Sequence, residues 1–356
     1  TTRTSTIPYH SKAFHFSSTL RSLSSFCIKK TCVQYMSSSS STKPPMPSTP
    51  FKMSTKGPLG EWQPLYDTTY TILMQTVNLP HLCVLTFLGI LYYATTGVLV
   101  LNPLMPLVSV FLMARVPFVG FCMSMSLHRY FAHGAFKTSR PVQFALAFLG
   151  SMALQGGILW WASKHNRHHK HCDEAKDPHS PTQKGTMYAW LGWLYYETHH
   201  DWQFVNKRLL TPELLVMNIL FFFPNLCVTW GLSRCIGNEW ALFLCWVPGL
   251  FGALATTHFN VEYHPPIDNR KPGQCVGVNR ASGDKGIGPI RLEWLACYCP
   301  WMFQPLVGEA FHHDHHNYPR RANRPGYDMP YFLVLQPLEK LGVVWDLQQP
   351  LDKFPV

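Results

Sequence analysis

Charged residues are scarce in this chain of 356 residues. Asp, Glu, Lys and Arg make up 14% of the sequence, whereas soluble globular proteins carry about 25%. Apolar residues reach 47%, which excludes a disordered chain and argues against an ordinary soluble enzyme. Residues 1–60 contain no Asp or Glu but many Lys and Arg residues. The net charge of +11 lies mainly in this segment, so we expect no nucleic-acid-binding surface.

Residues 1–60 are also rich in Ser and Thr, including the run Ser37–Ser41. This composition is typical of an organelle transit peptide, and a disordered tail is the alternative. The chain begins with Thr1 and its first methionine is Met36, so a translated upstream stretch without a role is a further alternative. We predict one domain over residues 61–356.

Cysteine pairs at the spacing of metal or redox motifs are absent. The eleven cysteines are scattered, and none of them forms a CxxC pair. Several stand inside apolar stretches, where cysteine packs as a small hydrophobe. We therefore expect no disulfide framework, and a reducing or membrane environment.

Long apolar runs are present. A transmembrane helix needs about 20 apolar residues. One of the runs contains Arg115, and a charged side chain inside a bilayer is energetically unfavourable. Short connections pair the runs into hairpins, so we predict an all-α integral membrane protein with four transmembrane helices. The four stretches are His81–Leu101, Leu104–Leu127, Leu214–Leu232 and Trp240–Thr257.

A fifth apolar segment, Pro141–Trp161, is predicted to be an interfacial or re-entrant helix. If it crossed the bilayer, the polar blocks on its two sides would lie on opposite faces. Lys and Arg gather in residues 162–211 and from residue 270 onward. The positive-inside rule then places both blocks on the cytosol-like face, where we expect them to form a helical cap.

Histidine is the most informative residue type in the chain. Neutral imidazole is the commonest metal ligand, and 18 histidines are present. Many fall into clusters with the patterns HxxxxH, HxxHH, NxxxH and HxxHH. A set of nine histidines and one asparagine is too large for one metal and suits two. These residues are His128, His133, His165, His168, His169, Asn260, His264, His312, His315 and His316.

Helical spacing predicts how these side chains point. His165 and His169 are four residues apart and share a helix face. His168 and His169 differ by about 100° around the axis, so the pair can reach two different metals. His128 and His133 differ by about 140° in an α-helix, so both can ligate only near a helix end or a local unwinding. In the four-span topology all the clusters lie on the positive face.

These motifs resemble the membrane fatty-acyl desaturases of the Δ9, stearoyl-CoA desaturase-like type, over about residues 61–350. The resemblance is carried by HRYFAH at 128–133, QGGILWWASKH at 155–165, DPHSP at 177–181, GEAFH at 308–312 and LEKLGVVWDL at 338–347. The NxxxH element narrows it to the Δ9 branch. The basic N-terminus adds the expectation of a plant or algal member in a plastid or endoplasmic reticulum membrane.

The resemblance implies a diiron centre with all nine of the clustered histidines as ligands. Asn260 would hold a metal-bound water. The sequence departs from the family at Asn166, where Arg is usual, and at Asp314, where the residue is usually uncharged. Both departures bear on substrate preference rather than on metal binding.

The resemblance also implies a reaction. Dioxygen and external electrons would insert a cis double bond, expected at Δ9, into a saturated sixteen- or eighteen-carbon acyl chain carried by coenzyme A or a lipid. The chain has no GxGxxG nucleotide fingerprint and no His-Pro-Gly-Gly motif of a fused cytochrome b5 domain. We therefore expect a separate donor on the cytosol or stroma side, cytochrome b5 in the endoplasmic reticulum or ferredoxin in a plastid.

Two alternatives remain open. A fatty-acyl hydroxylase could use the same kind of diiron centre, although the first histidine box of sterol-type hydroxylases is usually HxxxH. A non-catalytic membrane metal-binding protein is the alternative from a different class, but it predicts clusters spread along a path through the bilayer.

Further residues are expected to support the site. Ligating imidazoles usually donate their second N–H to a carboxylate or carbonyl, and Asp173, Asp177 and Glu309 stand near the clusters. Trp160 and Trp161 are expected to shape a substrate tunnel, with an interfacial aromatic belt as the alternative. The other histidines are expected to contact solvent or headgroups, with support of a ligand as an alternative for His179: His171, His179, His199, His200, His258 and His313.

Overall fold

The computed structural model describes residues 57–78, 118–236, 238–265 and 300–348, together with Phe87, Leu91, Thr95, Cys275, Gly277 and Val278. All of them belong to one compact unit, Ser54–Val356. Nearly all of the first predicted span, most of the second and Arg115 lie outside the described residues, as does nearly all of the segment 1–60.

Helices dominate the described part of the chain, in agreement with the predicted all-α class. Short 3-10 and π-helical segments connect or extend the α-helices. In chain order the elements are η1 Gly60–Trp62, α2 Gln63–Val77, η2 Met123–Ala132, β1 Lys137–Thr138, α5 Arg140–Ser151, α6 Ile158–His171, α7 Pro181–Lys184, η3 Tyr188–Gly192, α8 Trp193–Tyr196, η4 Trp202–Phe204, η5 Lys207–Leu209, α9 Pro212–Ile219, α10 Phe223–Ile236, α11 Asn238–Glu262, α12 Pro300–Val307, α13 His312–Asn317, η8 Pro330–Leu335, α14 Gln336–Lys340 and β2 Val344–Trp345.

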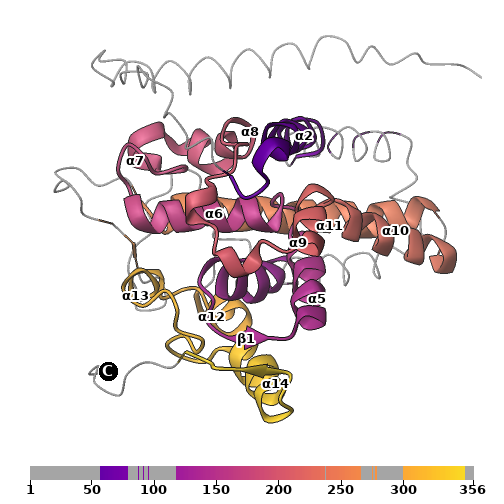
Figure 1. Cartoon of the computed structure of the whole chain (residues 1–356). Helices are drawn as coiled ribbons and strands as arrows, with labels where there is room; N and C mark the ends of the chain where they lie inside the picture. The colour runs from indigo at the N-terminus through magenta and orange to yellow at the C-terminus, as the bar shows by residue number, and fades with distance from the viewer. Residues whose placement is uncertain are drawn as a thin grey trace, which may run out of the picture. The chain divides into compact units, whose positions relative to one another are not determined.

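Helix α6 occupies the middle of this unit (Figure 1) and packs against η2, α9 and η4. Helix α11 packs against α10 and η3. The two short strands pair antiparallel, with Lys137 opposite Trp345. This pairing ties the C-terminal part of the chain to the residues that follow η2.

The segment Pro141–Trp161 contains two helices, which corrects the prediction of a single interfacial or re-entrant helix. Helix α5 ends at Ser151, and α6 begins at Ile158. Between them Leu154 and Gly156 adopt positive φ angles of 57° and 82°. A helix cannot continue through this left-handed backbone, so the chain turns and α6 takes its own direction.

Side chains from two other helices accept hydrogen bonds from the backbone N–H groups at the start of α6. Asn218 Oδ1 in α9 accepts hydrogen bonds from the backbone N–H groups of Leu159 (2.9 Å) and Trp160 (3.1 Å). Tyr70 Oη in α2 accepts one from Gly157 at 2.8 Å. The first N–H groups of a helix lack partners within it, so these contacts fix where α6 begins.

A buried charge network holds the back of α6. Lys164 is fully buried, and its Nζ lies 2.9 Å from Asp201 Oδ2 and 3.3 Å from Glu197 Oε2. Arg167 Nη1 lies 3.0 Å from the same two oxygen atoms. Because Lys164 and Arg167 are three residues apart, this network fixes the rotation of the helix about its axis.

Among the described residues, no single helix is long and apolar enough to span a bilayer. One bent pair meets the length and composition of a span, Pro212–Ile219 with Phe223–Cys235, and its two parts meet at 70°. The third predicted stretch, Leu214–Leu232, is therefore a broken pair of helices and not one straight span. The fourth predicted stretch lies within α11, a helix of 25 residues.

Candidate metal centre

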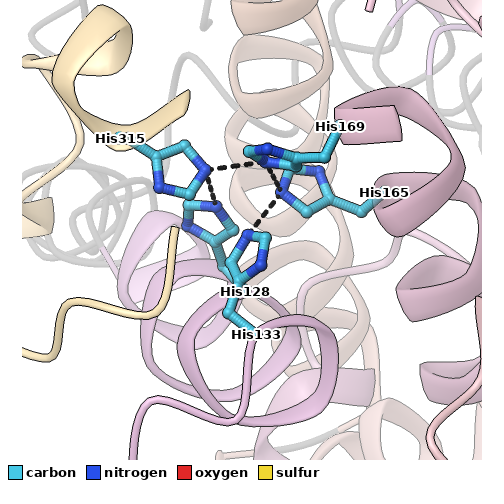
Figure 2. Close-up of side chains that lie close together, drawn as sticks. All are labelled: His128, His133, His165, His169 and His315. Atoms are coloured by element: carbon cyan, nitrogen blue, oxygen red, sulfur yellow. Dashed lines mark hydrogen bonds between the residues drawn. The ribbon is translucent and has the colours of Figure 1, made fainter. Parts of the chain in front are cut away.

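Five histidines converge at one point between η2, α6 and α13. Their Nε2 atoms form a chain of short separations (Figure 2): His128 to His315 2.8 Å, His315 to His169 2.9 Å, His169 to His165 3.0 Å and His165 to His133 3.0 Å. The figure shows all five rings turned toward a common centre. We call these residues the five-histidine group: His128, His133, His165, His169 and His315.

The π-helical form of η2 brings His128 and His133 into the same group. The backbone N–H of His133 donates to the carbonyl oxygen of His128 at 3.1 Å, which is the i→i+5 bond of a π-helix. The wider turn of a π-helix brings residues five apart closer in direction, whereas an α-helix would turn them about 140° away from one another. The local unwinding that the HxxxxH spacing requires is therefore this π-helix.

Four further histidines form a second cluster beside the first. The His264 Nε2 atom lies 2.8 Å from His312 Nε2 and 3.2 Å from His316 Nε2, and His168 Nε2 lies 3.4 Å from His316 Nε2. We call these residues the four-histidine group: His168, His264, His312 and His316.

Asn260 lies in the last turn of α11, four residues before His264, which follows the end of the helix, and it lines the same cavity as His168, His264 and His312. Its Nδ2 atom donates to the carbonyl oxygen of Ala189 at 3.4 Å. The structure thus brings together all ten of the residues that the sequence analysis assigned to metal binding.

Nearly every ring in both groups is neutral at physiological pH. Burial, reinforced by repulsion between neighbouring histidines, lowers the pKa of most of these rings well below the usual value (His133, His165, His169, His312, His315 and His316). His168 is different: burial acts to lower its pKa, but the Asp177 carboxylate outweighs burial and raises it. A neutral imidazole offers a nitrogen lone pair to a metal.

Carboxylates contact the outer nitrogens of three of these rings. The Nδ1 atom of His128 lies 2.9 Å from Glu309 Oε1, that of His168 lies 2.8 Å from Asp177 Oδ2, and that of His264 lies 3.4 Å from Asp173 Oδ2. A carboxylate accepts the Nδ1 proton and thereby leaves Nε2 as a bare acceptor. These are the three carboxylates that the sequence analysis singled out.

The donor set fits a metal ion in each group. Bare Nε2 acceptors about 3 Å apart repel one another unless a cation lies between them. Metal–imidazole bonds of about 2.0–2.1 Å separate neighbouring ligand atoms by roughly 3 Å, and the separations observed here are 2.8–3.4 Å. A set composed of imidazole nitrogens suits iron, zinc or copper rather than magnesium or calcium.

Buried arginines compensate the charge of Glu309. The Arg129 guanidinium binds Asp328 with two hydrogen bonds, 2.8 Å and 3.1 Å, and its Nε lies 3.6 Å from Glu309 Oε1. Arg324 Nε lies 3.8 Å from Glu309 Oε2. Burial acts to raise the pKa of Glu309, but His128, Arg324 and Arg129 outweigh it and lower that pKa to about 2. The carboxylate facing His128 is therefore charged.

A cavity lies against both histidine groups. Its polar lining includes Gln155 and Thr256, whose side chains are hydrogen-bonded to each other. Gln155 Oε1 also accepts a hydrogen bond from Trp161 Nε1 at 3.0 Å. Apolar side chains complete the lining: Met123, Trp161, Trp193 and Phe259. The sequence analysis missed Gln155 and Thr256 as site residues, because nothing in their spacing distinguishes them.

The two predicted tunnel tryptophans have different positions. Trp161 lines the cavity. Trp160 is fully buried behind it, stacks on Trp193 with ring centroids 5.2 Å apart, and donates from Nε1 to the carbonyl oxygen of Glu197 at 2.7 Å. Trp160 thus supports Trp193, which lines the cavity.

Several of the remaining histidines are not surface residues, contrary to expectation. His179 is buried against the His168 ring, with centroids 4.5 Å apart, which matches the alternative given for it. His200 is buried between Asp67 and Asn218. His258 is buried in α11, whereas His313 is exposed.

The expectation of unpaired packing cysteines needs one correction. A disulfide joins Cys172 and Cys275, whose Cα atoms lie 5.1 Å apart. Cys122 and Cys245, which stand inside predicted apolar stretches, are buried as expected of packing cysteines. No sequence motif indicated the pair, because 103 positions separate its members.

Comparison with known proteins agrees with this site. The sequence model of the fatty acid desaturase family matches residues 101–332. A hex-5-enoyl-[acyl-carrier protein] acetylenase of Moorena producens is 31% identical over 65% of this chain and 74% of that protein. The Delta(9)-fatty-acid desaturase fat-7 of Caenorhabditis elegans is 26% identical over 69% and 72%. The sn-1 stearoyl-lipid 9-desaturase of Anabaena variabilis is 26% identical over 64% and 79%.

The histidine-rich helical site and these similarities define an oxidoreductase of lipid metabolism. The chain belongs to the fatty acid desaturase family, whose members are membrane-bound.

Proposed function

We propose that this protein is a dioxygen-dependent fatty acyl desaturase that inserts a cis double bond, at Δ9, into a saturated sixteen- or eighteen-carbon acyl chain. The observation that carries the proposal is the pair of histidine groups, five and four, beside one cavity with a mostly apolar lining. The named Δ9-desaturases among the relatives support the bond position.

Two iron ions are the proposed cofactor, one in each group, with Asn260 holding a water at the four-histidine group. Bound iron would supply the redox chemistry, in which dioxygen, two external electrons and two protons remove two hydrogens from the acyl chain and leave as two waters. Asp173, Asp177 and Glu309 would hold the Nδ1 protons of His264, His168 and His128 and keep each Nε2 directed inward.

The cavity residues would position the substrate. Trp161 and Phe259 offer apolar contact to methylene groups, and the bridge from Trp161 through Gln155 to Thr256 fixes the shape of the wall. The methylene groups of an acyl chain are chemically alike. The position of the new double bond must therefore depend on where the cavity wall holds the chain relative to the irons.

The acyl carrier is coenzyme A or a lipid, and the electron donor is a separate protein, cytochrome b5 or ferredoxin. We place the enzyme in an endoplasmic reticulum or plastid membrane, with the site on the cytosol or stroma side. The acetylenase among the relatives makes conversion of a double to a triple bond a product to be sought as well.

Fatty-acid profiling of a desaturase-deficient yeast that expresses the chain tests this proposal. The expected result is a new monounsaturated fatty acid with its double bond at carbon 9, absent from a strain with His168→Ala and His169→Ala. His313→Ala is the matched control, because His313 is exposed on α13 and belongs to neither group. A hydroxylated or acetylenic product would replace the proposed reaction. Well-expressed protein without any new product in yeast and in a photosynthetic host would contradict it.

A further inference from the structure

The Cys172–Cys275 disulfide lies directly behind the four-histidine group. Cys172 follows the last residue of α6, and Cys275 belongs to the chain beyond His264. Each sulfur contacts the outer nitrogen of one histidine. Cys172 Sγ lies 3.8 Å from His264 Nδ1, and Cys275 Sγ lies 3.4 Å from His316 Nδ1. The disulfide thus connects the helix that carries His168 with the surroundings of two other members of the group.

At His316 a sulfur takes the place that a carboxylate takes at His128 and His168. The outer nitrogens of His128 and His168 face carboxylate oxygens at 2.9 Å and 2.8 Å. His264 Nδ1 faces both Asp173 and Cys172, and His316 Nδ1 faces the Cys275 sulfur. A disulfide sulfur has no proton, so it can only accept the Nδ1 proton. The oxidised pair therefore favours the tautomer in which Nε2 is directed inward.

The segment that carries Cys275 has further contacts near the site. The backbone N–H of Val278 donates to the carbonyl oxygen of Tyr263 at 3.1 Å, one residue before His264. Gly277 packs so closely on His313 that a Cβ atom there would lie 3.2 Å from its Cα. Within the described part of the chain, the disulfide cross-links this segment to the end of α6.

We propose that Cys172 and Cys275 are a reversible thiol–disulfide couple that positions His264 and His316, and that the disulfide state retains the metal of the four-histidine group more firmly. This inference rests on the metal centre of the proposed function. Reduction by a dithiol breaks the S–S bond. Two electrons and two protons pass to the cysteines, which become thiols, while the reductant becomes a disulfide.

Reduction would weaken the group in two ways. The two thiols are no longer held together, and each S–H can donate to an Nδ1 atom, which opposes the tautomer that ligation requires. The two sulfurs and the ring nitrogens of His264 and His316 also lie within 4.8 Å of one another. Once reduced, they form a set of two cysteines and two histidines, the kind of site that zinc prefers, and this set competes for the same imidazoles.

The first test compares the two redox states of the wild-type full chain, purified with iron bound. Mass spectrometry after thiol trapping should find the Cys172 and Cys275 peptides linked in the oxidised protein and separate after dithiothreitol treatment. Iron retained under a chelator should then fall about tenfold faster in the reduced state, for about one of the two irons. Absence of the linked peptide, or equal iron loss in both states, would overturn the inference.

Variants separate the effect of the couple from other effects of the reductant. Cys172→Ser and Cys275→Ser should lose iron at the reduced wild-type rate and should not respond to dithiothreitol. Cys235→Ser, which removes an exposed free cysteine of α10, should respond as the wild type does. If the serine variants do not fold, the comparison of the two wild-type states decides. A wild type that binds no iron in either state contradicts the proposed metal centre and this inference together.

Discussion

His168 and His169 are adjacent in the chain, yet their Nε2 atoms belong to two different histidine groups. His169 Nε2 lies 3.0 Å from His165 Nε2 in the five-histidine group, and His168 Nε2 lies 3.4 Å from His316 Nε2 in the four-histidine group. The turn of about 100° between neighbouring helical residues produces this division. One helix can therefore serve two metals held side by side.

Helix α13 repeats the arrangement. His312 and His316, four residues apart, belong to the four-histidine group, while His315 belongs to the five-histidine group. Each HxxHH box thus gives its i,i+4 pair to one group and its remaining histidine to the other. The box on α6 gives its pair to the five-histidine group, and the box on α13 gives its pair to the four-histidine group. Together α6 and α13 supply six of the nine ligands proposed here.

Substitution of Gln155, which lines the cavity, is expected to change the position of the double bond in the product. Gln155→Leu removes the hydrogen bonds to Trp161 and Thr256 without touching a histidine. We expect unchanged iron content, but a lower rate and a broader distribution of double-bond positions, measured by mass spectrometry of derivatised products. Gln203→Leu, at an exposed position in η4, is the control. An unaltered product distribution would show that Gln155 does not set the position.

The carboxylate behind His128 predicts a loss of metal affinity. Glu309→Gln keeps the shape of the side chain but removes the charge that Arg129 and Arg324 compensate. Changes of this type at the outer partner of a ligand reduce metal affinity or activity by about 10- to 100-fold. Chelator titration with iron analysis measures the effect, and Glu339→Gln on the exposed face of α14 is the control. Equal affinities in the two variants would refute the assignment.

Breaking the buried charge network behind α6 is expected to cause a large loss of folding stability. Lys164→Met leaves two buried carboxylates short of a cation, and breaking a buried pair in this way costs about 3–5 kcal/mol. Lys137→Met removes an ion pair of 2.8 Å with Asp346 whose side chains are 55% and 45% exposed, and such pairs contribute at most about 1 kcal/mol. Denaturant unfolding in detergent compares the variants. Similar losses would mean that the buried network does not hold the helix.

The same network predicts an acid-sensitive fold. Burial acts to raise the pKa of Glu197, but Lys164, Arg167 and Lys184 outweigh it and lower that pKa to about 2 from 4.5. Because the folded pKa is the lower one, the contribution is complete above pH 4.5 and is lost as pH falls toward 2. A shift of this size corresponds to about 3 kcal/mol. Glu197→Gln should flatten the loss of stability between pH 5 and pH 3, and an unchanged slope would disprove the link.

The sequence was sufficient to predict which histidines lie together, because spacing on a helix determines direction. That they bind metal stays a prediction. The boxes at 128–133, 165–169, 260–264 and 312–316 each predict their own geometry, and the structure adds the π-helical form of η2. That form was predictable only as a local unwinding, because its i→i+5 bond depends on packing and not on a residue pattern.

Features that depend on distant partners could not be predicted. The cavity wall joins Gln155 to Thr256 across 101 positions, and the disulfide joins Cys172 to Cys275 across 103. The division of Pro141–Trp161 into two helices depends on caps from Tyr70 and Asn218. Hydropathy alone could not reveal the 70° bend between α9 and α10.

Iron analysis of single-histidine variants tests the central claim most directly. The account predicts about two irons for each wild-type chain, held separately by the five- and four-histidine groups. His169→Ala should weaken one iron and His168→Ala the other, the double variant should lose both, and His313→Ala should keep both. Loss of the same iron in both single variants, or a wild type with one iron or none, would contradict a centre built from two groups.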